Sequence, residues 1–204
     1  MYKRDVEAIK AHVFHQGPDG LVDVVEFVLC TIQAGLSTVK MQRQDIAVEG
    51  FGSRFLWGQK GDGLAYTKKH KEFLWGKVYA IAECGYDDVD AIADVIELFM
   101  AVPNLGMVKA AFVAQCLGFN VACIDSHNLK RLGMSPQAVK VNLKAKRATI
   151  RKKVVEYVLM TQQEGSEYWW DSWCEYVAGN RANKELDTGD IVSRFHVDCI
   201  TMKG

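Results

Sequence analysis

An aspartate and a histidine stand two residues apart where a short loop gives way to a predicted helix, in the run Asp125-Ser126-His127. A carboxylate can accept a proton or stabilise a developing positive charge, and an imidazole can donate a proton near neutral pH. About twenty residues earlier lies a turn-forming run, Val102-Pro103-Asn104-Leu105-Gly106. This pairing makes Asp125 and His127 the first candidate catalytic residues.

Two predicted helices flank the turn and must position these groups. Residues 91–101 form an apolar-periodic helix and residues 107–117 a second one, with alanines that would allow close helix packing. Pro103 ends the first helix, while Asn104 and Gly106 are residue types that tolerate left-handed backbone. The unpaired amides at the start of the second helix suit a phosphate oxygen. The sequence therefore predicts a helical hairpin that contacts a polynucleotide backbone.

The same residues resemble the helix-hairpin-helix superfamily of base-excision DNA glycosylases. That family carries Leu-Pro-Gly-Val-Gly, a helix and Val-Asp-Thr-His, where this chain has residues 102–106, a helix and Ile124-Asp125-Ser126-His127. The resemblance implies an all-α, DNA-glycosylase-like helical bundle, one domain over residues 1–204, with the hairpin core at about 88–132. It implies a catalytic Asp125 and DNA contacts from the hairpin and the start of the next helix, at Asn104, Leu105, Gly106, Val108 and Lys109. Lys130 and Arg131, at the start of the basic run that follows Asp125, are further candidates for DNA binding.

Two positions depart from the family pattern. Asn104 stands where the family has its first hairpin glycine. Bifunctional members place a nucleophilic lysine two residues after the second glycine, and Val108 occupies that position. Lys109 is one residue further, about 100° round the helix, and we expect it to face elsewhere. Lyase chemistry through a Schiff base is accordingly not expected.

The C-terminal part carries a second resemblance. The run Trp170-Asp171-Ser172-Trp173-Cys174 and residues 192–197 are similar to a phage branch of the superfamily, named for α-glutamyl/putrescinyl-thymine pyrophosphorylases. This resemblance implies thymine hypermodification, in which an amine displaces a phosphate or pyrophosphate from a 5-substituted uracil in DNA. It adds His196 as a candidate acid, and a substrate pocket formed by Trp169, Trp173 and Arg194.

Three functions remain open at this level. The first is a DNA base-modifying transferase that acts on a flipped-out pyrimidine and uses an amine or amino-acid co-substrate. The second is a monofunctional DNA glycosylase that excises a damaged or modified base. The third is a noncatalytic DNA-binding helical module. None of these three functions requires a cofactor or a metal. The sequence also has no histidine–carboxylate cluster with the spacing of a metal site.

The composition of the chain limits the classes of protein to which it can belong. The chain has 204 residues, 49% of them hydrophobic, and its 25 basic and 25 acidic side chains balance. Six cysteines occur without a Cys-x-x-Cys pair, which indicates reduced thiols rather than an iron–sulfur loop. There is no apolar signal core and no run long enough for a membrane span. We therefore expect no membrane association and a cytoplasmic location, in an infected bacterial host if the gene is phage-borne.

Charge and aromatic residues are unevenly placed. Residues 126–155 hold nine lysines or arginines and no acid, which favours a polyanion site over a solubilising helix face. Asp90, Asp94 and Glu97 look like a solvated face. The tryptophans of residues 169–173 suit either a base pocket or core packing. The glycine-rich residues 37–63 suit either base stacking or a pinned connection.

Further helices are predicted from periodicity and capping signals. They cover residues 5–15, 21–34 and 65–84, with Asp87 or Asp88 as the cap of the next helix. A turn is expected at residues 17–20, and Ser135-Pro136 should begin another helix. A last helix is expected over residues 191–200.

Overall fold

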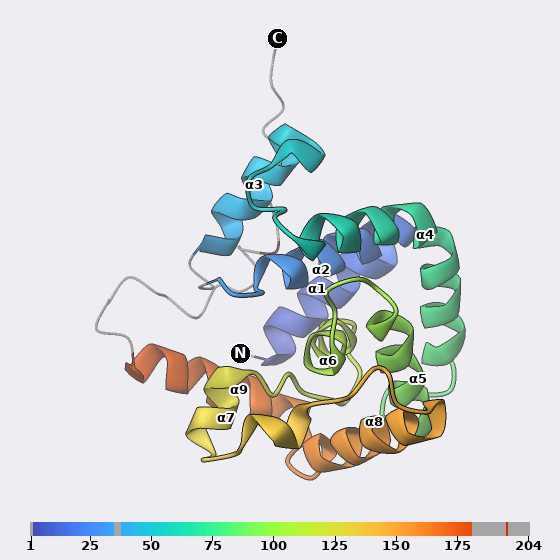
Figure 1. The fold of residues 1–204 in the computed structure, drawn as a ribbon, viewed down its shortest axis with the longest axis vertical. Helices are drawn as coiled ribbons and strands as arrows, with labels where there is room; N and C mark the ends of the chain where they lie inside the picture. Colours follow the sequence, from blue (N-terminus) through green and yellow to red (C-terminus); the bar gives the residue numbers. More distant parts are fainter. Residues whose placement is uncertain (1, 35–37, 181–194, 196–204) are drawn as a thin grey trace.

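The structure is a computed structural model that describes residues 2–34, 38–180 and 195, with side chains up to residue 176 and at 195. Across these residues every regular element is a helix, as predicted (Figure 1). The elements are α1 (Tyr2–Gln16), α2 (Pro18–Cys30), α3 (Val39–Glu49), η2 (Gly50–Gly52), α4 (Gln59–Ala82), α5 (Val89–Met100), α6 (Met107–Cys116), α7 (Ser126–Arg131), η3 (Pro136–Val139), α8 (Arg147–Gln162) and α9 (Gly165–Asn180).

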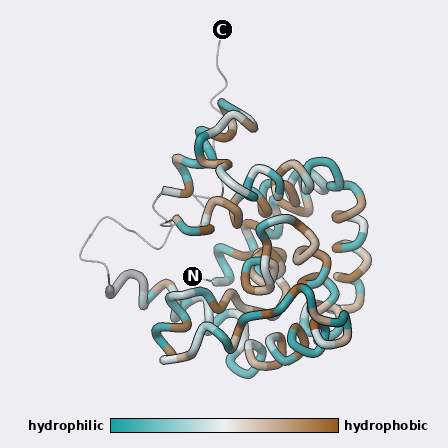
Figure 2. Tube along the Cα trace, viewed as in Figure 1, coloured by the Kyte–Doolittle hydropathy of each residue, from teal (hydrophilic) through white to brown (hydrophobic). Residues whose placement is uncertain are grey.

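The core is organised around α2, which is apolar on nearly every side. Val24, Val25 and Phe27 are fully buried, and the helix packs against α1, α3, α4 and α6. The polar residues of α2, Asp19, Asp23 and Glu26, lie along one narrow stripe, and the rest of the helix must be enclosed by other helices, as its sequence predicted. Figure 2 shows the hydrophobic residues gathered on the central helices, α6 among them, while hydrophilic residues dominate the outer turns.

Three local predictions differ from the structure. Residues 39–49 form the helix α3 within the glycine-rich residues 37–63, for which no helix was predicted, because Val39 and Ile46 bury one side of it. The turn predicted over residues 17–20 is confined to Gly17, whose φ is 59°, since α2 begins at Pro18 and Gly20 lies against α1. Ser135 caps only the short helix η3, and α8 does not begin until Arg147.

The predicted helical hairpin is α5, a short turn and α6, and the two helices pack together. Asp88 caps α5 as predicted, its carboxylate accepting the Ala91 amide at 2.7 Å. In the turn, Asn104 adopts a left-handed φ of 68°. Gly106 does not: its φ is −77°, a value open to any residue, and it serves as the N-cap of α6. Only Asn104 therefore bears out the expected left-handed backbone.

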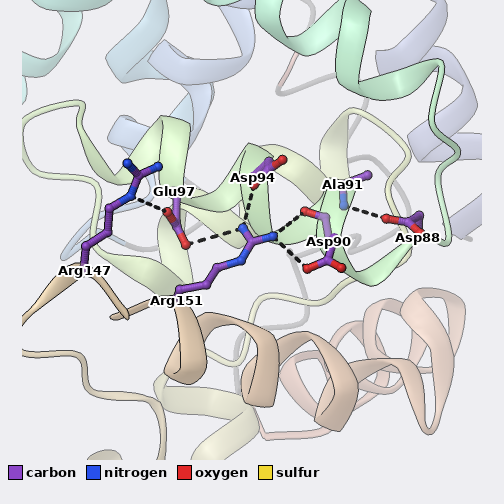
Figure 3. A network of polar contacts seen from close by, with 7 residues as sticks. All are labelled: Asp88, Asp90, Ala91, Asp94, Glu97, Arg147 and Arg151. Atoms are coloured by element: carbon purple, nitrogen blue, oxygen red, sulfur yellow. Dashed lines mark hydrogen bonds and ion pairs between the residues drawn. The ribbon is translucent and has the colours of Figure 1, made fainter. Parts of the chain in front are cut away.

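Two arginines of α8 form salt bridges with carboxylates of α5, and Arg151 makes most of them (Figure 3). The guanidinium of Arg151 contacts Asp90 at 2.9 Å, Asp94 at 2.7 Å and Glu97 at 3.4 Å. These carboxylates are therefore more than a solvated face. Part of the basic run is likewise neutralised, because Arg147 lies 4.0 Å from Glu97 and Lys153 pairs with Glu156 at 2.9 Å.

Among the residues that the structure describes, no helix combines the length and the apolar character needed to cross a membrane.

Candidate functional site

A cavity of about 650 Å³ opens between the C-terminal end of α2, helices α6 and α9, and the segment that leads into α7. Three tryptophans and two phenylalanines form much of its wall, and the polar groups on it are few. A mainly apolar cavity with a few converging polar groups is the usual form of a small-molecule site. The residues used below are Phe27, Thr31, Val108, Lys109, Phe112, Gln115, Asp125, His127, Trp169, Trp170 and Trp173.

Asp125 lies at the cavity wall, half-buried, as the N-cap of α7. Its Oδ1 accepts the amides of His127 and Asn128, both at 3.0 Å. Its Oδ2 accepts the indole N–H of Trp173 at 3.1 Å. Three donors fix the orientation of the carboxylate, which has about four lone-pair positions in all. The group is held rigidly while its surface towards the cavity stays open to a ligand.

The segment before Asp125 is fixed by buried side chains. The Tyr157 hydroxyl donates to the Ala122 carbonyl at 2.6 Å and accepts the Ile124 amide at 2.9 Å. Gln115 accepts the Cys123 amide at 3.1 Å. Because these partners come from α8 and α6, the position of Asp125 depends on the packing of helices distant in sequence. Sequence reasoning missed Tyr157 and Gln115, which carry no motif.

Each tryptophan of α9 at the cavity is oriented by its indole N–H. Trp169 donates to the Thr161 carbonyl at 2.9 Å, and Trp170 donates to the buried carboxylate of Asp5 at 3.2 Å. Trp169 and Trp170 are each 5% exposed, yet both line the cavity. These two tryptophans therefore pack in the core and also form part of the pocket wall, so both predictions for the cluster hold. Trp170 was not among the predicted pocket residues.

His127 also lies on the cavity wall, half-buried. Its ring packs edge-on against Trp173, with centroids 6.2 Å apart, and lies near Tyr176 at 6.4 Å. Asp125 and His127 are thus brought to one cavity. The structure does not describe His196 or Arg194, so their predicted roles lie outside the described residues.

Lys109 differs from the prediction. It was expected to face away from the position of the family lysine, but Val108 and Lys109 both line the cavity that holds Asp125. Successive helical residues diverge by about 100°, and a long lysine side chain can span that angle. The cavity is bounded by both α2 and the segment that holds Asp125. The side chains of Val108 and Lys109 therefore both reach it, although they leave α6 in different directions.

The hairpin surface contributes a second, smaller hollow of about 240 Å³. The start of α6 and the chain after η3 face each other across it: Gly106, Met107, Val108, Lys109, Val139, Lys140, Val141 and Leu143. Leu105 is 2% exposed and donates its amide to Val102 within the turn, so its side chain belongs to the core. A DNA contact through the Leu105 side chain is therefore ruled out. Asn104 is half-buried in the turn.

The two cations of α7 behave differently. Lys130 is exposed. Arg131 donates to Asn128 at 3.3 and 3.2 Å and to the Tyr168 hydroxyl at 3.3 Å, and its guanidinium lies 5.5 Å from the ring centroids of Tyr168 and Trp169. Stacked in this way, Arg131 helps to hold α7 against α9. Lys130 is consequently the freer of the two for a phosphate.

Within the described part of the chain, no group of three or more histidine, cysteine, aspartate or glutamate side chains has the arrangement of a metal site. His12 contacts Asp23 at 2.8 Å. Cys30, Cys116 and Cys123 are free thiols, as predicted, and so is Cys84.

No known family model, curated protein or solved structure matches the chain.

Proposed function

We propose that this protein is a DNA base-modifying enzyme. An extruded pyrimidine would enter the cavity beside Asp125 and exchange a 5-(pyro)phosphomethyl leaving group for an amine. The observation that carries the proposal is the placement of Asp125, a carboxylate held by three N–H groups at the wall of a cavity lined by tryptophan. Aromatic faces stack on a flipped base, and a fixed carboxylate can act on it.

The hollow beside the hairpin supports a polynucleotide partner. The first amides of α6 have no acceptor within the helix, and they lie across the hollow from the exposed Lys140. The amides at a helix N-terminus and a nearby lysine ammonium can together bind one backbone phosphate. Since Val108 and Lys109 contribute to both the hollow and the cavity, a strand held at the first would present a base to the second.

The reaction is a substitution at the exocyclic methylene. The amine nitrogen forms a bond to the methylene carbon, the carbon–oxygen bond breaks, and the phosphate leaves with the bonding electrons. The attacking amine loses a proton to the carboxylate of Asp125. The imidazolium of His127, on the same cavity wall, protonates the departing oxygen.

The size of the cavity is sufficient for an exchange reaction with two reactants. Its volume of about 650 Å³ lies within the range of about 300–1,000 Å³ that is common for small-molecule sites. That volume accommodates a pyrimidine ring together with an amine co-substrate. Hydrolytic removal of a base requires only water as the second reactant.

The test is to incubate the protein with DNA that carries 5-phosphomethyluracil, together with amines such as putrescine or glutamate, and to analyse the nucleosides by mass spectrometry. A new aminomethyl nucleoside is the expected product. Free base with an abasic site would replace the proposal by a glycosylase activity. Binding without any product would identify a noncatalytic module.

Asp125→Asn should abolish turnover while DNA binding is retained, because asparagine can still cap α7 but cannot take up the proton. Asp88→Asn is the matched control: it makes the same change at the N-cap of α5, and Asp88 does not line the cavity. The control should keep the wild-type rate. Full turnover by Asp125→Asn would refute the catalytic role of Asp125.

A further inference from the structure

We propose that Lys109 and Thr31 form an anion subsite inside the cavity, which binds a negatively charged substituent on the ring of the bound base. This inference rests on the proposed function for the nature of the ring, but the charge preference has its own test. The subsite lies on the walls formed by α2 and α6, whereas Asp125 lies on the segment that leads into α7.

The first argument is the hydrogen bonding of the ammonium. Lys109 Nζ lies 3.0 Å from Thr31 Oγ1, and the Thr31 hydroxyl donates its single hydrogen to the Val28 carbonyl at 2.6 Å. Thr31 must therefore accept from Lys109. The chain from ammonium to hydroxyl to carbonyl fixes Nζ and occupies one of its three N–H groups. The others remain for a ligand.

The second argument is the missing counter-charge. Over the ranges that the structure describes, Lys109 has a hydrogen bond to Thr31 and no ion pair with a carboxylate. Asp125, on the same cavity, accepts its hydrogen bonds from the N–H groups of His127, Asn128 and Trp173. The closest aromatic partner is Phe112, whose ring centroid lies 5.4 Å from Nζ. A half-buried cation in an apolar cavity is costly to leave uncompensated. An anionic ligand would supply that compensation.

A second lysine, Lys60, does not line the cavity but interacts electrostatically with Lys109. Lys60, at the start of α4, is 2% exposed, and its Nζ lies 4.7 Å from the centroid of Trp57. Burial lowers the pKa of Lys60, and the charge of Lys109 lowers it further. Two neighbouring cations repel each other, so a bound anion relieves the repulsion. The preferred substituent is therefore an anion such as a phosphate or a carboxylate.

The experiment compares two oligonucleotides that differ only in one charge. One carries a single 5-carboxyuracil and the other a single 5-carbamoyluracil, and unmodified DNA gives the baseline affinity. Wild-type protein should bind the carboxylate oligonucleotide about tenfold more tightly than the carbamoyl one. Lys109→Met should reduce this ratio to about one, while Lys109→Arg should restore part of it.

The controls separate charge recognition from folding and from general DNA binding. Lys69→Met removes an exposed cation of α4 that does not line the cavity, so the ratio should stay as in the wild type. Lys109→Met should not lower the thermal unfolding midpoint, since it removes an uncompensated cation. If it does unfold the protein, Thr31→Val provides the second test, because it removes only the oxygen that holds Nζ.

The results of these binding measurements would support or overturn the anion subsite as follows. A ratio near one for the wild type, or a ratio that survives both Lys109→Met and Thr31→Val, overturns the anion subsite and leaves the proposed function standing. If neither modified base binds better than unmodified DNA and neither changes tryptophan fluorescence, the base does not enter the cavity. That result overturns both proposals.

Discussion

One tyrosine hydroxyl supplies partners for two backbone groups just before Asp125. Tyr157 is 2% exposed, and burial raises the pKa of its hydroxyl well above the usual value, so the group stays protonated and can keep donating. A buried carbonyl and a buried amide that lose their partner are costly, whereas the ring itself contributes only packing. The hydroxyl of Tyr157 is thus a positioning group for the cavity wall.

Tyr157→Phe should lower the free energy of unfolding by about 1–3 kcal/mol, because it leaves the Ala122 carbonyl and the Ile124 amide without their partner. Urea denaturation followed by circular dichroism measures the loss. Tyr79→Phe is the control, since the Tyr79 side chain is 52% exposed. Equal stabilities for the two variants would contradict the role assigned to Tyr157.

At the scale of elements, the hairpin turn is supported from outside by α4. A Cβ built on Gly63 would lie 2.4 Å from the carbonyl oxygen of Pro103, which is closer than atoms approach in proteins, and 3.3 Å from Leu29. Helix α4 can therefore approach the turn only with glycine at this position. Gly76, in the same helix, has no atom within 4 Å of such a Cβ.

Alanine substitutions at Gly63 and Gly76, both in α4, should therefore have opposite effects on the stability of the protein. Gly63→Ala should destabilise the protein by about 1–3 kcal/mol, because backbone must move to admit the methyl group. Gly76→Ala should be neutral or stabilise by up to about 1 kcal/mol, because alanine restricts the unfolded chain and favours helix. Urea midpoints measured side by side provide the comparison, and a stable Gly63→Ala variant would show that α4 and the turn do not touch.

At the scale of the whole molecule, burial ties stability to pH through the thiols. Cys116 is fully buried and Cys30 is 2% exposed. Burial raises the pKa of Cys30 from 9.0 to about 12 and raises that of Cys116 as well. Above about pH 9 the unfolded chain releases these protons while the folded chain retains them. The contribution of these thiols to stability is therefore fully present below pH 9 and is lost as the pH rises.

Urea denaturation in reducing buffer at pH 8, 9 and 10 should show this decline, with each buried thiol contributing at most about 1.4 kcal/mol per pH unit above its unfolded pKa. Cys116→Ala should flatten the slope, whatever its effect on stability at pH 8. Cys84→Ala, which changes an exposed thiol, should leave the slope unchanged. A slope that is the same in all three proteins would rule out Cys116 as a cause of the decline.

Local signals account for the helices and for some of their ends. The apolar run of α2 predicted a central helix, and Asp88 was one of two predicted caps for α5, because periodicity and capping depend on residues close in sequence. Helices that depend on burial against distant parts of the chain were predicted less well from the sequence. Helix α3 lies in a glycine-rich stretch and depends on Val39 and Ile46 packing against the core.

The sequence by itself determined that the described chain is helical and that Asp125 begins a helix, because both follow from short-range backbone chemistry. Only the tertiary structure placed Lys109, Trp170 and Asp125 around one cavity, and only it paired Arg151 with the acids of α5. The physical reason is that the direction of a long side chain, and the charge it meets, depend on how helices distant in sequence pack together. Residue spacing within one helix cannot specify that packing.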